Sequence, residues 1–136
     1  MFDWSHYLDL ARNLVGETDI KPSDEAKART SISRSYYCIY HAAREYLKEE
    51  GDTNIGQKME DSHIYVIEQL RNRPERKLSQ IGNNLYRLKD DRVRADYEGD
   101  IKILLKEAEK VLRLASWLKA QLENEVKLLR LKSGKL

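Results

Sequence analysis

The chain has 136 residues, of which 35% are charged and 40% are hydrophobic, a balance typical of one small domain whose helices keep wet outer faces. Its 25 basic and 23 acidic side chains give a net charge of +2, too small to steer nucleic acid toward the whole molecule. Because the sequence has no uncharged apolar run of about 18 residues and no signal-like N-terminus, we expect a cytoplasmic protein that does not enter a membrane.

Apolar residues recur at helical spacing along the chain and never alternate as they do in a strand. A first helix is expected over residues 4–15, with Asp3 as its N-cap. A second, long helix is expected over residues 24–50, capped by Ser23 and ended by Gly51.

The second half of the chain predicts three more helices. Residues 51–61 are polar and contain two glycines, so we expect a loop there, before a third helix over residues 62–71. Pro74 can start a fourth helix. The charged residues 90–100 are interpreted as the connection to a long last helix, with Asp100 as its cap.

Two apolar stripes define the expected core. The stripe of the second helix consists of Ala28, Ile32, Tyr36, Ile39, Ala43 and Leu47, with Tyr40 at its edge. The stripe of the last helix consists of Leu104, Ala108, Val111, Ala115, Leu118, Leu122, Val126 and Leu129. These patterns predict an all-α fold: one domain over residues 1–136, an antiparallel up-and-down bundle of four to five helices with a long C-terminal helix. Because the last stripe is longer than such a bundle needs, we expect a homodimer.

The side of the second helix that faces away from its core stripe carries Arg34, Tyr37 and His41. Arg34 and His41 are seven residues apart and therefore almost in line, with Tyr37 between them. Such a polar line needs water, an anion or acidic partners. His41 is either a structural histidine or part of a composite cleft with Arg34 and Tyr37.

Residues 71–94 form a basic stretch, with eight basic and three acidic side chains, a local charge of 8 − 3 = +5. The basic residues are Arg71, Arg73, Arg76, Lys77, Arg87, Lys89, Arg92 and Arg94. Local clustering of this kind favours phosphate binding, so Arg87, Lys89 and Arg94 are candidate RNA contacts, together with Tyr37. The alternative is an ordinary solvated helix face.

Two segments carry a family resemblance. Residues 31–44, with Ser33-Arg34, Tyr36-Tyr37 and His41-Ala42-Ala43, resemble the second-helix signature of HEPN-domain proteins. The similarity is closest to an uncharacterised subgroup of small HEPN-like proteins with S-R-x-Y-Y and A-D-Y motifs. Residues 92–97 match the R-x-x-x-D-Y element of that subgroup, and His63 matches a histidine that is common in it.

The resemblance implies a homodimeric helical bundle that belongs to a toxin–antitoxin pair, with a minimal nucleotidyltransferase as the antitoxin partner. Active HEPN proteins are metal-independent ribonucleases whose motif is an Arg followed a few residues later by a His. An Arg fork can hold a phosphate, and a His can carry protons at neutral pH. By the same resemblance, Tyr97 corresponds loosely to a tyrosine that a partner nucleotidyltransferase adenylylates.

The sequence departs from this motif after Arg92, because Asp96 stands where the catalytic His is expected. An ordinary Asp is ionised at neutral pH and cannot act as a general acid. Asp96 could serve as a base or could pair with Arg92 or Arg94. Arg92, Asp96 and Tyr97 are therefore either a structural ion-pair network or part of a site.

We expect Arg34, His41, Arg92 and Asp96 to gather around one polar cleft. The first functional hypothesis is the HEPN-type toxin of a toxin–antitoxin pair, which binds RNA and cleaves it without metal. The alternative is a non-catalytic dimeric partner or regulator of a nucleotidyltransferase. The three histidines lack metal-ligand spacing, so neither a metal site nor a cofactor is expected.

Overall fold

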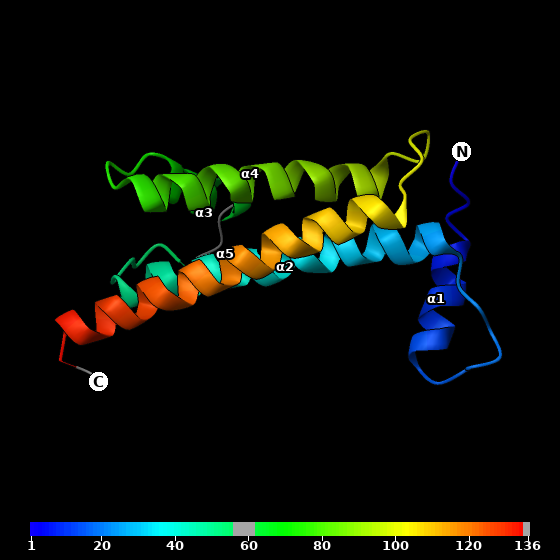
Figure 1. The fold of residues 1–136 in the computed structure, drawn as a ribbon, viewed down its shortest axis with the longest axis horizontal. Coiled ribbons are helices and arrows are strands. Elements are labelled where there is room, and N and C mark those ends of the chain that lie inside the picture. The colour runs from blue at the N-terminus through cyan, green and yellow to red at the C-terminus, as the bar shows by residue number, and fades with distance from the viewer. Residues whose placement is uncertain (56–61, 135–136) are drawn as a thin grey trace.

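The computed structural model describes residues 1–55 and 62–134, and in that part the chain forms five helices and no strand (Figure 1). The helices are α1 (His6–Leu14), α2 (Asp24–Glu49), α3 (Ser62–Arg71), α4 (Arg76–Tyr97) and α5 (Leu105–Lys132). The all-α bundle with a long C-terminal helix is thereby confirmed. Within residues 51–61, for which a loop was predicted, residues 56–61 lie outside the described part.

The start and end of α2 follow the sequence signals. Ser23 accepts a hydrogen bond from the backbone N–H of Ala26 at 3.1 Å, as an N-cap should. Gly51 has a φ of 93°, a left-handed conformation that suits glycine and ends the helix. The expected core stripe of α2 is buried along its whole length.

The predicted connection over residues 90–100 is wrong for residues 90–97, because α4 continues through the charged stretch to Tyr97 and the connection begins only after it. Leu88, Arg92 and Ala95 extend the buried face of the helix at three- and four-residue spacing. The predicted cap of the last helix is also wrong. α5 begins after Leu104, whose side chain is 49% exposed, and Ile103 is buried in its place.

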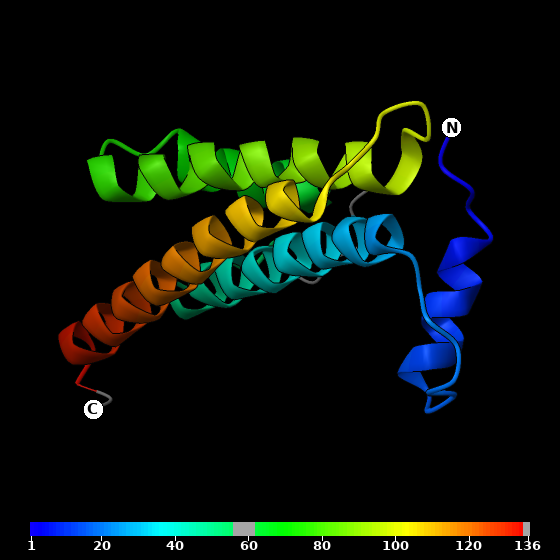
Figure 2. The same cartoon turned by 45° about the vertical axis from the view of Figure 1, so that its right-hand side comes forward.

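The helices of the bundle do not alternate strictly in direction. At one end Ile103, just before α5, donates its backbone N–H to Glu25 of α2 at 3.2 Å. At the other end Arg130 of α5 pairs with Glu49 of α2 at 2.9 Å, so α2 and α5 run in parallel along their length. Arg29, near the start of α2, donates hydrogen bonds to carbonyls at the end of α4. α4 therefore runs antiparallel to α2 and α5 (Figures 1 and 2).

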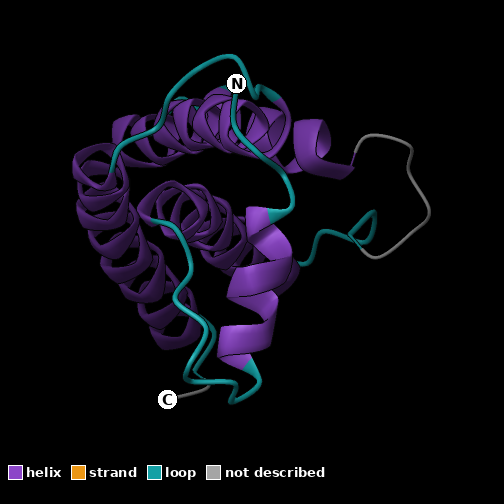
Figure 3. Cartoon of the chain, turned by 90° about the vertical axis from the view of Figure 1, so that its right-hand side faces the viewer, coloured by secondary structure: helices purple, strands orange, loops and turns teal. Residues whose placement is uncertain are grey.

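Two smaller elements complete the fold. α3 runs in the direction of α2 and packs on α4, where Gly82 allows a close approach: a Cβ at Gly82 would lie 2.4 Å from the backbone N of Arg71. α1 crosses one end of the bundle (Figure 3). Its buried residue, Leu10, packs with Phe2 and Ala26 in a small second cluster.

Candidate functional site

Arg92 lies on the buried face of α4 but makes few polar contacts. The residue is 9% exposed, and its one ion pair with a described residue joins Nη1 to Oδ2 of Asp96 at 3.6 Å. The guanidinium lies 5.4 Å from the ring centre of Tyr36 and 5.5 Å from that of Tyr37. Its Nε is buried and has no hydrogen-bond partner in the described part of the chain. A buried charge so poorly paired is costly unless something else binds it.

α2 brings Ser33 and Arg34 to the same place. The Ser33 hydroxyl donates to Oδ2 of Asp96 at 3.2 Å, and Arg34 donates from Nη2 to the Ser33 hydroxyl at 3.2 Å. The Arg34 guanidinium also lies 4.9 Å from the ring centre of Tyr37. Three of the four residues expected in one cleft, Arg34, Arg92 and Asp96, are therefore linked.

His41 is the expected member that the contacts do not join to this group. It is exposed, and its ring contact in the described chain is an edge-on one with its neighbour Tyr40, at 5.3 Å between centroids. Seven residues along α2 are almost two helical turns, so sharing a helix face with Arg34 does not give His41 a shared contact.

A different histidine, His63 at the start of α3, enters the site. Its Nδ1 lies 2.5 Å from the Tyr36 hydroxyl. Its ring stacks on Tyr40 with 4.1 Å between centroids and meets Tyr37 edge-on at 5.8 Å. Burial, and then the positive charge of Arg92, lower the pKa of His63 below its ordinary value. The family resemblance was the one sequence signal for His63, because no periodicity connects it to α2 or α4.

We call the group of Ser33, Arg34, Tyr36, Tyr37, His63, Arg92 and Asp96 the Arg92 site. It consists of a buried cation, a second cation, a carboxylate and a half-buried imidazole. The two arginines and the imidazole lie against the rings of Tyr36 and Tyr37. Such a set can hold an anion through arginine donors and can stack a planar group on an aromatic ring.

Two of the other RNA-binding candidates lie elsewhere. Arg87 and Arg94 line a groove of about 230 Å³ between α4 and α5, whose other lining residues include Ile32, Ile103, Val111 and Leu114. Arg94 is paired there with Asp91 at 3.9 Å and with Glu98 at 4.0 Å, an exposed ion-pair network. Lys89 lies on the other side of α4, near enough for its charge to lower the pKa of His63. Tyr97 is 71% exposed, near the surface as expected.

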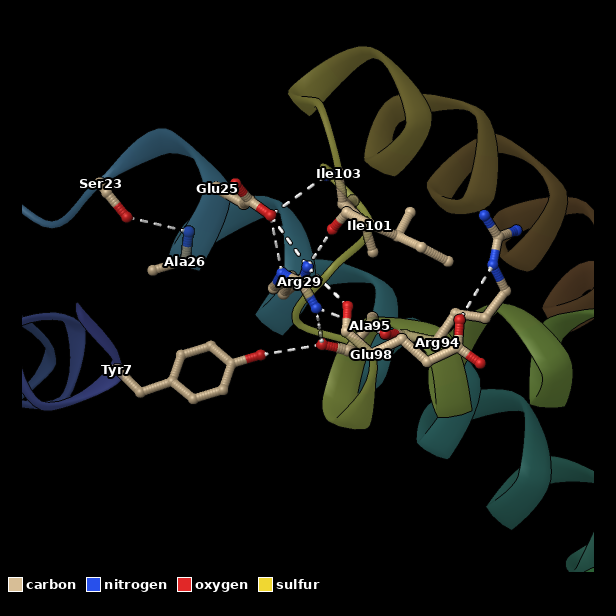
Figure 4. Close-up of polar contacts among 10 residues, drawn as sticks. All are labelled: Tyr7, Ser23, Glu25, Ala26, Arg29, Arg94, Ala95, Glu98, Ile101 and Ile103. Atoms are coloured by element: carbon tan, nitrogen blue, oxygen red, sulfur yellow. Dashed lines mark hydrogen bonds and ion pairs between the residues drawn. The ribbon is translucent and has the colours of Figure 1, made fainter. Parts of the chain in front are cut away.

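A second buried arginine, Arg29, was missed by the sequence reasoning. It is 0% exposed and lies between the start of α2 and the end of α4 (Figure 4). Its Nη1 donates to the carbonyl of Ala95 at 2.8 Å, and its Nη2 donates to those of Glu98, at 3.0 Å, and Ile101. Glu25 balances its charge at 2.9 Å. Arg29 thus caps α4 from another helix.

Among the residues that the structure describes, no three His, Cys, Asp or Glu side chains are grouped as metal ligands. No helix in the described ranges is long and apolar enough to cross a membrane. Comparison with family models, curated proteins and solved structures gives no match to this chain.

Proposed function

We propose that this chain is a HEPN-type protein that acts on RNA, the toxin component of a pair with a nucleotidyltransferase antitoxin. The observation that carries the proposal is Arg92, a buried arginine that makes no hydrogen bond within the described chain. A phosphate group would supply the charge and the acceptors that this side chain lacks. The S-R-x-Y-Y motif and the R-x-x-x-D-Y element, on which the family resemblance rests, contribute Arg34, Tyr36, Tyr37, Arg92 and Asp96 to this same place.

The surroundings of Arg92 favour RNA over a free anion. Arg34 is exposed and can turn toward a second phosphate along a strand. Tyr37 is half-buried beside it, a surface on which a base could stack. Lys89 and Arg44 add positive charge around His63.

The alternative function, a non-catalytic dimeric partner or regulator of a nucleotidyltransferase, is supported by a different observation. Asp96 accepts from Ser33 and pairs with Arg92, so it is engaged as a structural acceptor at the position where active HEPN proteins carry the catalytic His. The exposed Tyr97 fits a role as the residue that a nucleotidyltransferase adenylylates.

A homodimer is part of both proposals. Trp117, Leu128 and Leu131 lie on the outer face of α5, where they are 47%, 42% and 61% exposed. Apolar side chains at this spacing would be covered by a second copy. Sedimentation at micromolar concentration should give twice the monomer mass, and a folded monomer would contradict the dimer.

Fluorescence anisotropy with a labelled single-stranded RNA tests the main proposal. Arg92→Met should weaken binding by about tenfold or more and reduce its salt dependence. Arg113→Met, which removes an exposed arginine of α5, is the matched control and should change affinity by less than about threefold. Equal losses in both variants would mean that RNA does not use the Arg92 site. Gel analysis of the same RNA distinguishes cleavage from binding alone.

A further inference from the structure

We infer that His63, rather than His41, is the histidine that contacts the bound phosphate at the Arg92 site and takes up a proton when the phosphate binds. The inference rests on the proposed function. It names a histidine for the site, since Asp96 stands where the catalytic His is expected. It also gives α3 a direct part in binding, although the spacing of residues along the sequence does not connect α3 to the site.

His63 and Arg92 lie against the same two aromatic rings. Arg92 is 5.4 Å from the ring centre of Tyr36 and 5.5 Å from that of Tyr37, and the corresponding distances for the His63 ring are 5.6 Å and 5.8 Å. Arg92 is also close enough for its charge to lower the pKa of His63, so a phosphate held by Arg92 would lie close to the His63 ring. In the described chain the ring of His41 meets Tyr40, and not the Tyr36 and Tyr37 rings that Arg92 and His63 share.

The two nitrogens of His63 have different surroundings. Nδ1 is engaged with the Tyr36 hydroxyl at 2.5 Å, whereas Nε2 has no hydrogen-bond partner in the described chain. Nε2 is therefore the nitrogen open to a ligand oxygen. A tyrosine hydroxyl can donate to a neutral imidazole or accept from a protonated one, so Tyr36 supports both states of His63 without losing the hydrogen bond. Burial raises the pKa of the Tyr36 hydroxyl, which keeps it in this neutral form.

The charges around His63 set its response to an anion. Among the described residues, the titratable and charged groups that surround it are Tyr36, Tyr37, Tyr40, His41 and Arg44 of α2, and Lys89 and Arg92 of α4. Burial and the four basic residues lower the pKa of His63, so the free protein holds it neutral at neutral pH. A phosphate placed among these groups cancels part of their charge and favours the protonated form, which donates from Nε2 to the phosphate.

The deciding experiment is an NMR titration of the imidazoles of His6, His41 and His63, in the free protein and with two ligands. One ligand is a single-stranded RNA without terminal phosphates, and the other is inorganic phosphate. We expect RNA to raise the pKa of His63 by about one unit. The affinity for RNA should then increase about fivefold from about pH 8 to about pH 6 in the unmodified chain and less than about twofold in His63→Gln.

Each outcome separates the two proposals. If Arg92→Met weakens RNA binding but the pKa of His63 is unchanged, or that of His41 rises instead, the inference on His63 is overturned and the proposed function stands. If inorganic phosphate shifts His63 and RNA does not bind, the inference stands for phosphate itself and the RNA function is overturned. If neither ligand binds, both are overturned. His6→Gln is the control for loss of a histidine outside the site.

Discussion

The two buried arginines of this chain are treated in opposite ways by their surroundings. Arg29 donates to backbone carbonyls at the end of α4 and is balanced by Glu25. Arg92, three residues before Ala95 on α4, has one ion pair with a described residue, at 3.6 Å, and a buried Nε without a partner among those residues. A guanidinium whose N–H donors all have acceptors stabilises the fold, whereas a guanidinium with unpaired donors is suited to binding a ligand. Burial alone would not have distinguished them.

The largest expected effect comes from Arg29→Met. The substitution removes the guanidinium that balances the Glu25 carboxylate and donates to the carbonyls at the end of α4, so the free energy of unfolding should fall by about 3–5 kcal/mol. Urea denaturation measures it, with the exposed Lys27→Met on the same helix as the control. A loss below about 1 kcal/mol would mean that Arg29 is not the structural arginine.

Arg92→Met should separate function from stability. Because the native side chain makes no hydrogen bond to the described residues, a methionine of similar length should leave the free energy of unfolding unchanged or raise it by about 1–2 kcal/mol, while RNA affinity falls. The measurements are the same urea denaturation and RNA anisotropy on one sample. Destabilisation above about 2 kcal/mol would place Arg92 in the same class as Arg29.

Tyr7→Phe tests how far the Arg29 network extends. The Tyr7 hydroxyl donates to the carbonyl of Ala95 at 3.2 Å, an acceptor that Arg29 already satisfies. The loss should therefore be only about 0.5–1.5 kcal/mol. Tyr86→Phe, on an exposed tyrosine of α4, is the matched control, and equal melting shifts in both variants would remove Tyr7 from the network.

The smallest effect concerns pH. In the folded state the pKa of His63 lies below its ordinary value of 6.5. As pH falls through that value, His63 is therefore protonated in the unfolded chain before it is protonated in the folded chain. Stability should decrease slightly below about pH 6.5 in the absence of ligand, and His63→Gln should remove that part of the decrease. Unfolding curves across this range check it. A slope that is the same in the variant would mean that His63 does not titrate differently on folding.

Local signals in the sequence determined much of the fold. The apolar period of α2, the cap at Ser23 and the stop at Gly51 all act within a few residues, so they fixed that helix and its buried face. The bounds of α3 were predicted for the same reason. The pairing of Arg34 with the Asp96 region was expected from polar residues that need partners, and the contacts bring them together.

Only the tertiary structure decided where α4 ends and which histidine joins the site. The charged residues at the end of α4 stay helical because Arg29, more than 60 positions earlier in the chain, satisfies their carbonyls. His63 reaches Tyr36 because α3 begins beside the middle of α2, a position set by packing on α4 through Gly82. Both facts depend on contacts between segments distant in sequence, and periodicity within one helix carries no information about them.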